Sequence, residues 1–120
     1  MNEFQRALKR WADAKIIAAD NSQLLRERNG KGAEECTRIS DICKQRMDDL
    51  HDAEEMLMKF KDSPDASAAM RAYVAAETDK GCSRCWLSSR MGKNHPECNM
   101  KITRWFAARK VLFNEGLQLQ

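Results

Sequence analysis

Three cysteines and one histidine fall close together near the C-terminal end of the sequence, in the order Cys82-x2-Cys85-x9-His95-x2-Cys98. A Cys-x2-Cys pair forms a tight turn whose two sulfurs point toward a common centre, and two further sulfur or imidazole ligands complete a tetrahedron. Soft and borderline ligands of this kind select Zn²⁺ over Mg²⁺ or Ca²⁺. The sequence therefore predicts one Zn²⁺ per chain, held by these four residues.

The predicted zinc site is structural, because four protein ligands leave no open position for a catalytic water. Binding of this type contributes on the order of 10 kcal/mol to a small fold, so we expect the metal to order a knuckle ahead of the last helix. A redox dithiol is the alternative for Cys82 and Cys85. That motif belongs on alternating strands and helices, and no segment here alternates as a strand.

Two long amphipathic segments precede the metal site and predict an antiparallel helical hairpin, over about 2–29 and 33–61. Apolar residues recur along the first segment at helical spacing, among good helix formers and without proline. Two glycines, Gly30 and Gly32, then supply the turn. Since only a short turn joins the two helices, they are expected to pack against each other.

The second long segment carries a regular apolar seam. Four of its residues fall seven apart, which is the spacing of a helix-packing face: Cys36, Cys43, Leu50 and Leu57. Arg46 interrupts the companion row, and neighbouring Met47 is expected to cover the gap. Buried cysteine behaves as a small apolar residue, so Cys36 and Cys43 are expected in the core and not at the metal.

Two shorter helices complete the predicted all-α fold, at about 64–79 and 96–114, with the knuckle between them. Ser63 is predicted to cap the first of these, with Pro64 in its first turn. Pro96 opens the second, which places His95 and Cys98 at a positively polarised helix start, and Gly116 is expected to end it.

The chain of 120 residues suits a single domain. We divide it into a helical-bundle part, 1–79, and a part made of the zinc-binding knuckle and the C-terminal helix, 80–120. The net charge of the first part is −3 and that of the second is +6. The basic character therefore belongs to the cysteine-rich end.

Basic, aromatic and polar side chains surround the predicted zinc site. Cationic groups on a metal-pinned loop can bind phosphates, and an exposed tryptophan can stack on a base. A solvated charged face, or a tryptophan packed beneath the knuckle, is the plainer explanation. The predicted nucleic-acid or partner-binding residues are Arg84, Trp86, Arg90, Lys93, Lys101 and Arg104.

The last helix has more apolar surface than one helix-packing contact would bury. Arg109 falls in the middle of its main apolar arc, so that arginine must be paired, extended toward solvent or directed at a partner. Met100, Ala107 and Val111 form a second, smaller apolar stripe. Such a stripe fits a protein partner or a homodimer.

Several classes of protein are disfavoured by the sequence. Motifs for nucleotide binding, zinc-protease and serine-hydrolase chemistry are absent, and histidine is scarce, so we expect neither an enzyme nor a small-molecule substrate. The sequence shows no long apolar run and no signal peptide, so we expect neither membrane insertion nor secretion. An odd count of five cysteines favours metal binding in a reducing, cytoplasmic setting over a disulfide framework.

Two hypotheses for function follow. In layout alone, a helical hairpin with a zinc finger resembles small bacterial and phage transcription factors. That resemblance favours a small zinc-containing regulator of bacterial or phage type, which binds nucleic acid or a nucleic-acid-processing enzyme through its basic zinc-site surface. The alternative is a protein-binding inhibitor or adaptor that acts through the hairpin and homo-oligomerisation, with zinc only as a structural element.

Overall fold

The computed structural model describes residues 1–79 and 96–119, with the side chains of residues 96–98 left out. Across this described part every regular element is a helix, and no strand occurs. In chain order the helices are α1 (Glu3–Ala19), α2 (Asn21–Glu27), α3 (Ala33–Met58), α4 (Ala68–Asp79) and α6 (Pro96–Gln118). The predicted all-α fold is confirmed at this level.

The N-terminal helix begins with a reciprocal cap and ends earlier than the sequence indicates. The Asn2 side chain accepts a hydrogen bond from the Gln5 amide at 2.8 Å, and the Gln5 side chain accepts one from the Asn2 amide at 3.0 Å. Asp20 then separates α1 from α2, so the single helix predicted over 2–29 is interrupted. Buried Asn21 opens α2, where its side-chain amide donates to the Cys43 carbonyl of α3 at 3.2 Å.

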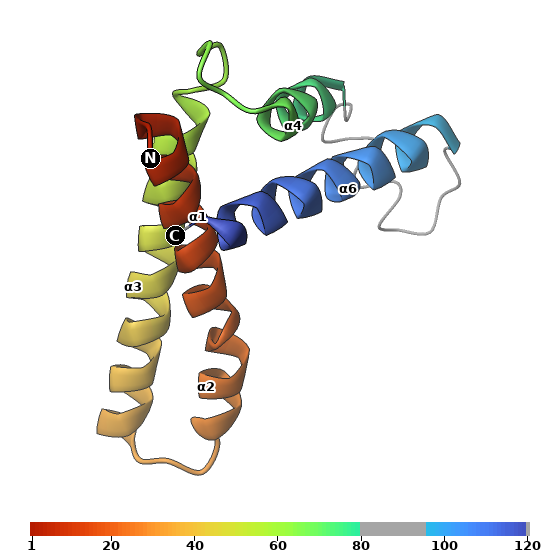
Figure 1. Ribbon diagram of the computed structural model, residues 1–120. Helices are drawn as coiled ribbons and strands as arrows, with labels where there is room; N and C mark the ends of the chain where they lie inside the picture. Colours follow the sequence, from red (N-terminus) through yellow and green to blue (C-terminus); the bar gives the residue numbers. More distant parts are fainter. Residues whose placement is uncertain (80–95, 120) are drawn as a thin grey trace.

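Helix α3 lies alongside α1 and α2 (Figure 1). The Trp11 indole N–H donates to Glu54 at 3.3 Å, and an Arg28 guanidinium N–H donates to the Ser40 hydroxyl at 3.1 Å. Most of the predicted seam is buried, as are the companion residues Ile39 and Ala53. The helix ends at Met58, three residues before the predicted end.

A different serine from the predicted one caps α4. The Ser67 hydroxyl accepts a hydrogen bond from the Met70 amide at 3.2 Å, and it donates one to Glu115 of α6 at 2.9 Å. Ser63 instead accepts from the Asp65 amide, inside the turn that precedes the helix. The helix therefore starts at Ala68 rather than at residue 64, because a contact with α6 fixes its cap.

Helix α6 continues past the glycine that was expected to end it. Gly116 is buried inside the helix, and a Cβ built there would lie 2.8 Å from the Ala12 Cβ and 3.1 Å from the Leu8 carbonyl oxygen. The glycine therefore lets α6 approach α1, and it does not act as a helix terminator.

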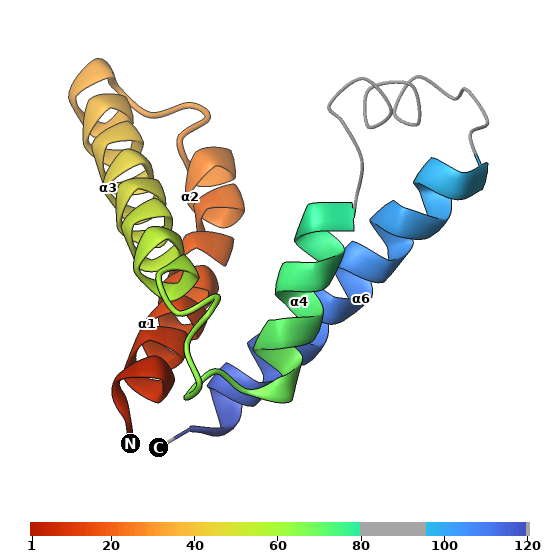
Figure 2. The same cartoon turned by 90° about the horizontal axis from the view of Figure 1, so that it is seen from above.

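One core joins the helices. Its buried members come from α1, α3, α4, α6 and the turn before α4, and they are Phe4, Leu8, Trp11, Leu50, Ala53, Leu57, Ala66, Met70, Tyr73 and Leu112. The α1–α3 pair and the α4–α6 pair diverge from the place where the two chain ends lie close together (Figure 2). The molecule is flat, with extents of 48 × 44 × 20 Å. Among the described helices, none combines the length and hydropathy needed to cross a bilayer.

Candidate metal centre and basic surface

Most of the predicted zinc ligands lie outside the described residues. Cys82, Cys85 and His95 belong to the segment 80–95, and Cys98 belongs to the first turn of α6, where the structure describes the backbone alone. Pro96 is the first residue of α6, as predicted. The ligand set itself stays a prediction.

Helices α4 and α6 flank that segment and lie side by side (Figure 2). Asp79 at the end of α4 pairs with Lys101 near the start of α6, with 3.8 Å between Lys101 Nζ and Asp79 Oδ1. One turn farther along, the Trp105 indole N–H donates to Glu77. Since later residues of α6 meet earlier residues of α4, the two helices are antiparallel, and the C-terminal end of α4 lies near the start of α6.

The described residues offer no alternative metal site. The described residues contain no group of three or more histidine, cysteine, aspartate or glutamate side chains that could hold a metal ion. Cys43 is buried, with 8% of its surface exposed, and Cys36 is half-buried with its Sγ 3.5 Å from the Lys31 carbonyl oxygen. These two cysteines therefore serve packing between α2 and α3.

Two of the predicted partner-binding residues can be placed. Lys101 and Arg104 line a shallow groove of about 520 Å³ between α4 and α6, whose floor is made of small residues. Arg104 is exposed, while Lys101 is half-exposed and paired with Asp79. The other lining residues are Ala72, Ala75, Ala76, Asp79 and Ala108. The remaining predicted residues, Arg84, Trp86, Arg90 and Lys93, lie outside the described part of the chain.

Arg109 is paired inside the molecule, which was one of the three expectations for it. Its guanidinium donates to Glu54 of α3 at 2.6 Å and to the Tyr73 hydroxyl of α4 at 3.0 Å. The guanidinium also lies 5.3 Å from the ring centroid of Trp11 and 5.3 Å from that of Trp105. One side chain of α6 thus contacts the three other long helices, and it is not available to a partner.

The surroundings of Arg109 shift two proton affinities. Burial raises the pKa of the Tyr73 hydroxyl, against the opposing effect of the Arg109 charge. Burial, together with Arg109, lowers the pKa of Lys15, whose ammonium lies 5.1 Å from the Phe113 ring centroid. These groups lie where the helices meet, and Tyr73 also lines a small pocket of about 160 Å³ with Trp11 and Glu54.

The second apolar stripe of the last helix is exposed. Met100 and Val111 keep 55% and 57% of their surface, and Ala107 between them is also exposed. Phe106 on a neighbouring face keeps 53%. An apolar stripe of this length on a described helix is available for contact with another protein.

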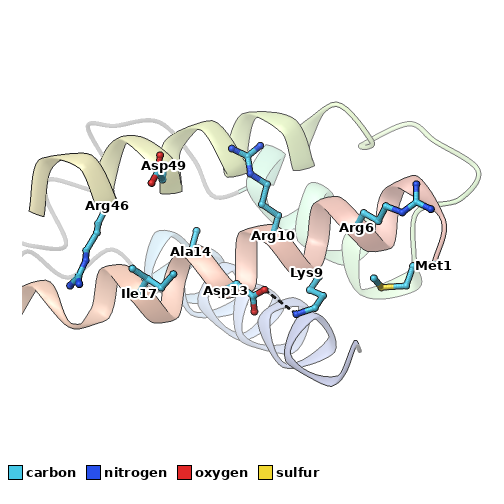
Figure 3. Close-up of a pocket in the computed structure, with 9 residues that line it drawn as sticks. All are labelled: Met1, Arg6, Lys9, Arg10, Asp13, Ala14, Ile17, Arg46 and Asp49. Carbon is cyan, nitrogen blue, oxygen red and sulfur yellow. Dashed lines mark hydrogen bonds and ion pairs between the residues drawn. The ribbon is translucent and has the colours of Figure 1, made fainter. Parts of the chain in front are cut away.

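Sequence reasoning missed a groove between α1 and α3. Arg46 fills the break in the seam that Met47 was expected to cover, and Met47 is 39% exposed instead. Arg46 reaches from α3 toward α1 at the end of a groove where Ile17 lies, and the basic residues of α1 line the groove toward its other end (Figure 3). The available signal was Arg6 and Arg10, which are four residues apart and share a helix face with each other.

Comparison with models of known families, with curated proteins and with solved structures gives no match to this chain.

Proposed function

We propose that the protein is a small, non-enzymatic, zinc-containing regulator of bacterial or phage type. It binds nucleic acid, or an enzyme that processes nucleic acid, through the basic surface around its zinc site. The observation that supports this most is the antiparallel α4–α6 pair, in which the Asp79–Lys101 contact joins the end of α4 to the first turns of α6. Two antiparallel helices that flank a short loop in this way suit a loop that closes around one metal ion.

In this proposal Zn²⁺ is bound by Cys82, Cys85, His95 and Cys98. Three thiolates and one Zn²⁺ carry a net charge of −1, which leaves the strongly basic 80–120 part with about +5. A positive field of that size attracts polyanions and accelerates their association. The thiolates also require a reducing compartment, so we propose a cytoplasmic location.

The proposed contact surface combines the loop with the α4–α6 groove. Arg104 is exposed there, and the alanine floor allows a phosphate backbone to approach closely. Lys101 is placed beside it. Arg84, Arg90 and Lys93 would add further phosphate contacts from the loop, and Trp86 would stack on a base.

Elemental analysis of the purified protein tests the metal. We expect one zinc per chain, and we expect Cys85→Ser to lower that ratio while Cys36→Ser leaves it unchanged. A Cys85→Ser protein that keeps a full equivalent of zinc would contradict the ligand set.

A polarisation titration with duplex and single-stranded oligonucleotides at two salt concentrations tests the binding. Replacing Arg104 and Lys101 by alanine is expected to weaken binding and to lower the salt slope by roughly 2, at about 0.9 per lost phosphate contact. The matched control is Lys31→Ala with Lys44→Ala, which removes the same charge from two exposed positions, one in the α2–α3 turn and one in α3. Absence of any binding at low salt would refute the nucleic-acid proposal.

The exposed stripe of α6 supports a second candidate, a protein-binding inhibitor or adaptor. In it, α1, α2 and α3 act as a helical hairpin, assembly or homodimerisation uses Met100, Ala107 and Val111, and zinc is only structural. Light scattering after size exclusion would then show a dimer that Val111→Glu converts to a monomer. A strict monomer at all concentrations would count against homodimerisation.

A further inference from the structure

A groove runs along one side of the contact between α1 and α3 (Figure 3). It encloses about 590 Å³, and both helices contribute to its walls: Met1, Arg6, Lys9, Arg10, Asp13, Ala14 and Ile17 from the N-terminal side, and Arg46 and Asp49 from α3. At the helical rise, the wall from Arg6 to Ile17 is about 17 Å long. The groove is therefore elongated, and it is much larger than a single phosphate ion.

The charges along the groove are unbalanced. Its four cationic side chains face only two carboxylates, and one of these is already used, because Lys9 Nζ pairs with Asp13 Oδ2 at 2.9 Å. Arg6 and Arg10 are exposed and make no side-chain hydrogen bond or ion pair with any residue that the structure describes. The groove therefore keeps a net positive charge that a ligand could neutralise.

Arg46 has a hydrogen-bond donor without an acceptor. Its Nη1 atom is buried and has no hydrogen-bond partner within the described part of the chain. Figure 3 shows this side chain reaching from α3 toward α1, at the same end of the groove as Ile17. A buried guanidinium N–H without an acceptor is costly, so the Arg46 side chain gains when it turns outward to a carboxylate, the acceptor that best matches it.

Apolar surface lies beside these cations. Ile17 is 49% exposed and Ala14 is half-buried, and both line the groove. A ligand that satisfies the whole groove must therefore present carboxylates and apolar side chains along a length of about 17 Å. A helix of about 12 residues with glutamate or aspartate flanking an apolar stripe meets all of these requirements.

We propose that the α1–α3 groove docks an acidic amphipathic helix of a partner protein, with carboxylates on Arg10 and Arg46 and apolar side chains against Ala14 and Ile17. The groove involves neither the zinc segment nor the α4–α6 surface, so this proposal stands apart from the proposed function. A regulator with two such faces could hold nucleic acid or its processing enzyme on one and an acidic partner on the other.

The test uses a fluorescent synthetic peptide of about 14 residues, with glutamate and leucine at helical spacing, titrated into the full-length protein. The control peptide has glutamine in place of every glutamate, so it keeps the shape and loses the charge. We expect the glutamate peptide to bind at least about tenfold more tightly than the control and to weaken as salt is added.

The matching protein variant is Arg10→Met with Arg46→Met, which keeps apolar stems of similar length. It is expected to lose at least about tenfold in affinity for the glutamate peptide. The control variant, Arg38→Met with Lys44→Met, removes the same charge from exposed positions of α3 and should bind normally. Because Arg46 Nη1 has no partner to lose, the double variant should fold with an unchanged or raised unfolding midpoint.

Amide chemical-shift mapping on the unaltered protein locates the peptide independently of any variant. Shifts confined to 6–17 and 46–49 would support the proposal. Equal affinity for the two peptides, an unaffected double variant, or shifts located elsewhere would overturn it. Arg46-dependent binding of inorganic phosphate without binding of the glutamate peptide would also overturn it, since the groove would then be a small-anion site.

Discussion

At the scale of single residues, Gly116 shows how one missing side chain sets the crossing of two helices. A Cβ at this position would meet the Ala12 Cβ at 2.8 Å and the Leu8 backbone, and neither can move aside as a flexible side chain would. Gly116→Ala gains about 1 kcal/mol of helix propensity, but overpacking typically costs more, about 1–3 kcal/mol. We expect a net loss of about 1 kcal/mol in the free energy of unfolding, measured by urea denaturation.

Asn114→Ala is the matched control for Gly116→Ala. Asn114 is exposed on the same helix, so its replacement should change stability by less than about 0.5 kcal/mol. Stabilisation by Gly116→Ala would show that α1 and α6 do not approach as closely as described.

Also at the scale of single residues, Tyr73 makes the free energy of unfolding depend on pH. Because burial raises its pKa in the folded protein, the folded state holds the phenolic proton more tightly than the unfolded state does. Its contribution to stability is full below the unfolded pKa of about 10 and is lost as pH rises through the folded pKa. We expect the free energy of unfolding to fall in this alkaline window, and Tyr73→Phe to remove that part of the fall.

The measurement for Tyr73 is direct, because the chain has one tyrosine. Tyrosinate absorbance in the ultraviolet therefore titrates this group alone, in the folded and the urea-unfolded protein. Lys15 acts in the opposite direction, since its lowered pKa favours folding as pH rises, and the optical titration is blind to it. An identical midpoint in both states would contradict the prediction.

At the scale of helices, the start of α4 depends on a side chain that serves two purposes. The Ser67 hydroxyl caps the Met70 amide and donates to Glu115 of α6. Ser67→Ala is expected to cost about 1–2 kcal/mol in the free energy of unfolding. Ser63→Ala, at the cap expected from the sequence, should cost less than half as much. The measurement is urea denaturation monitored by circular dichroism. Equal losses of unfolding free energy in the two variants would contradict this assignment of the cap.

Some features of the helices could be predicted from the sequence, and others could not. Helices were predictable because periodicity is local, and Leu50 and Leu57 of the α3 seam are buried as expected. The cap at Ser67 and the continuation of α6 through Gly116 were not, since each depends on contacts with a helix distant in sequence. The break at Asp20 was not predicted either, and the next residue, Asn21, is the one that bonds to α3. In the sequence, Arg46 was visible only as a break in an apolar row. Its groove could not be predicted, because α1 forms the second wall.

At the scale of the whole molecule, the proposed zinc site ties together only one of the two helix pairs. Segment 80–95 joins α4 to α6 in the chain, whereas α1 and α3 contribute most of the buried residues of the shared core. Removal of zinc by a chelator is therefore expected to loosen α4 and α6 first. Amide hydrogen exchange should accelerate at least about tenfold in 68–79 and 96–118, with a smaller change in 33–58.

Cys85→Ser protein is the control for zinc removal, and the chelator should change its exchange little. Uniform acceleration across all helices would show instead that the metal stabilises the molecule as one unit. The ligand set was inferred from spacing alone, and the α4–α6 pairing that brackets it needed the structure, because the Asp79–Lys101 contact has no signature in the sequence.

The Arg109 cluster also gives the molecule an internal optical reporter. Trp11 belongs to one helix pair and Trp105 to the other, and both indole rings flank the same guanidinium. Indole emission responds to a nearby charge and to water, so any change in the angle between the two pairs would alter the fluorescence of both rings. Binding of a partner at the α1–α3 groove could thus be followed without a label, once Trp86→Phe removes the only other indole in the chain.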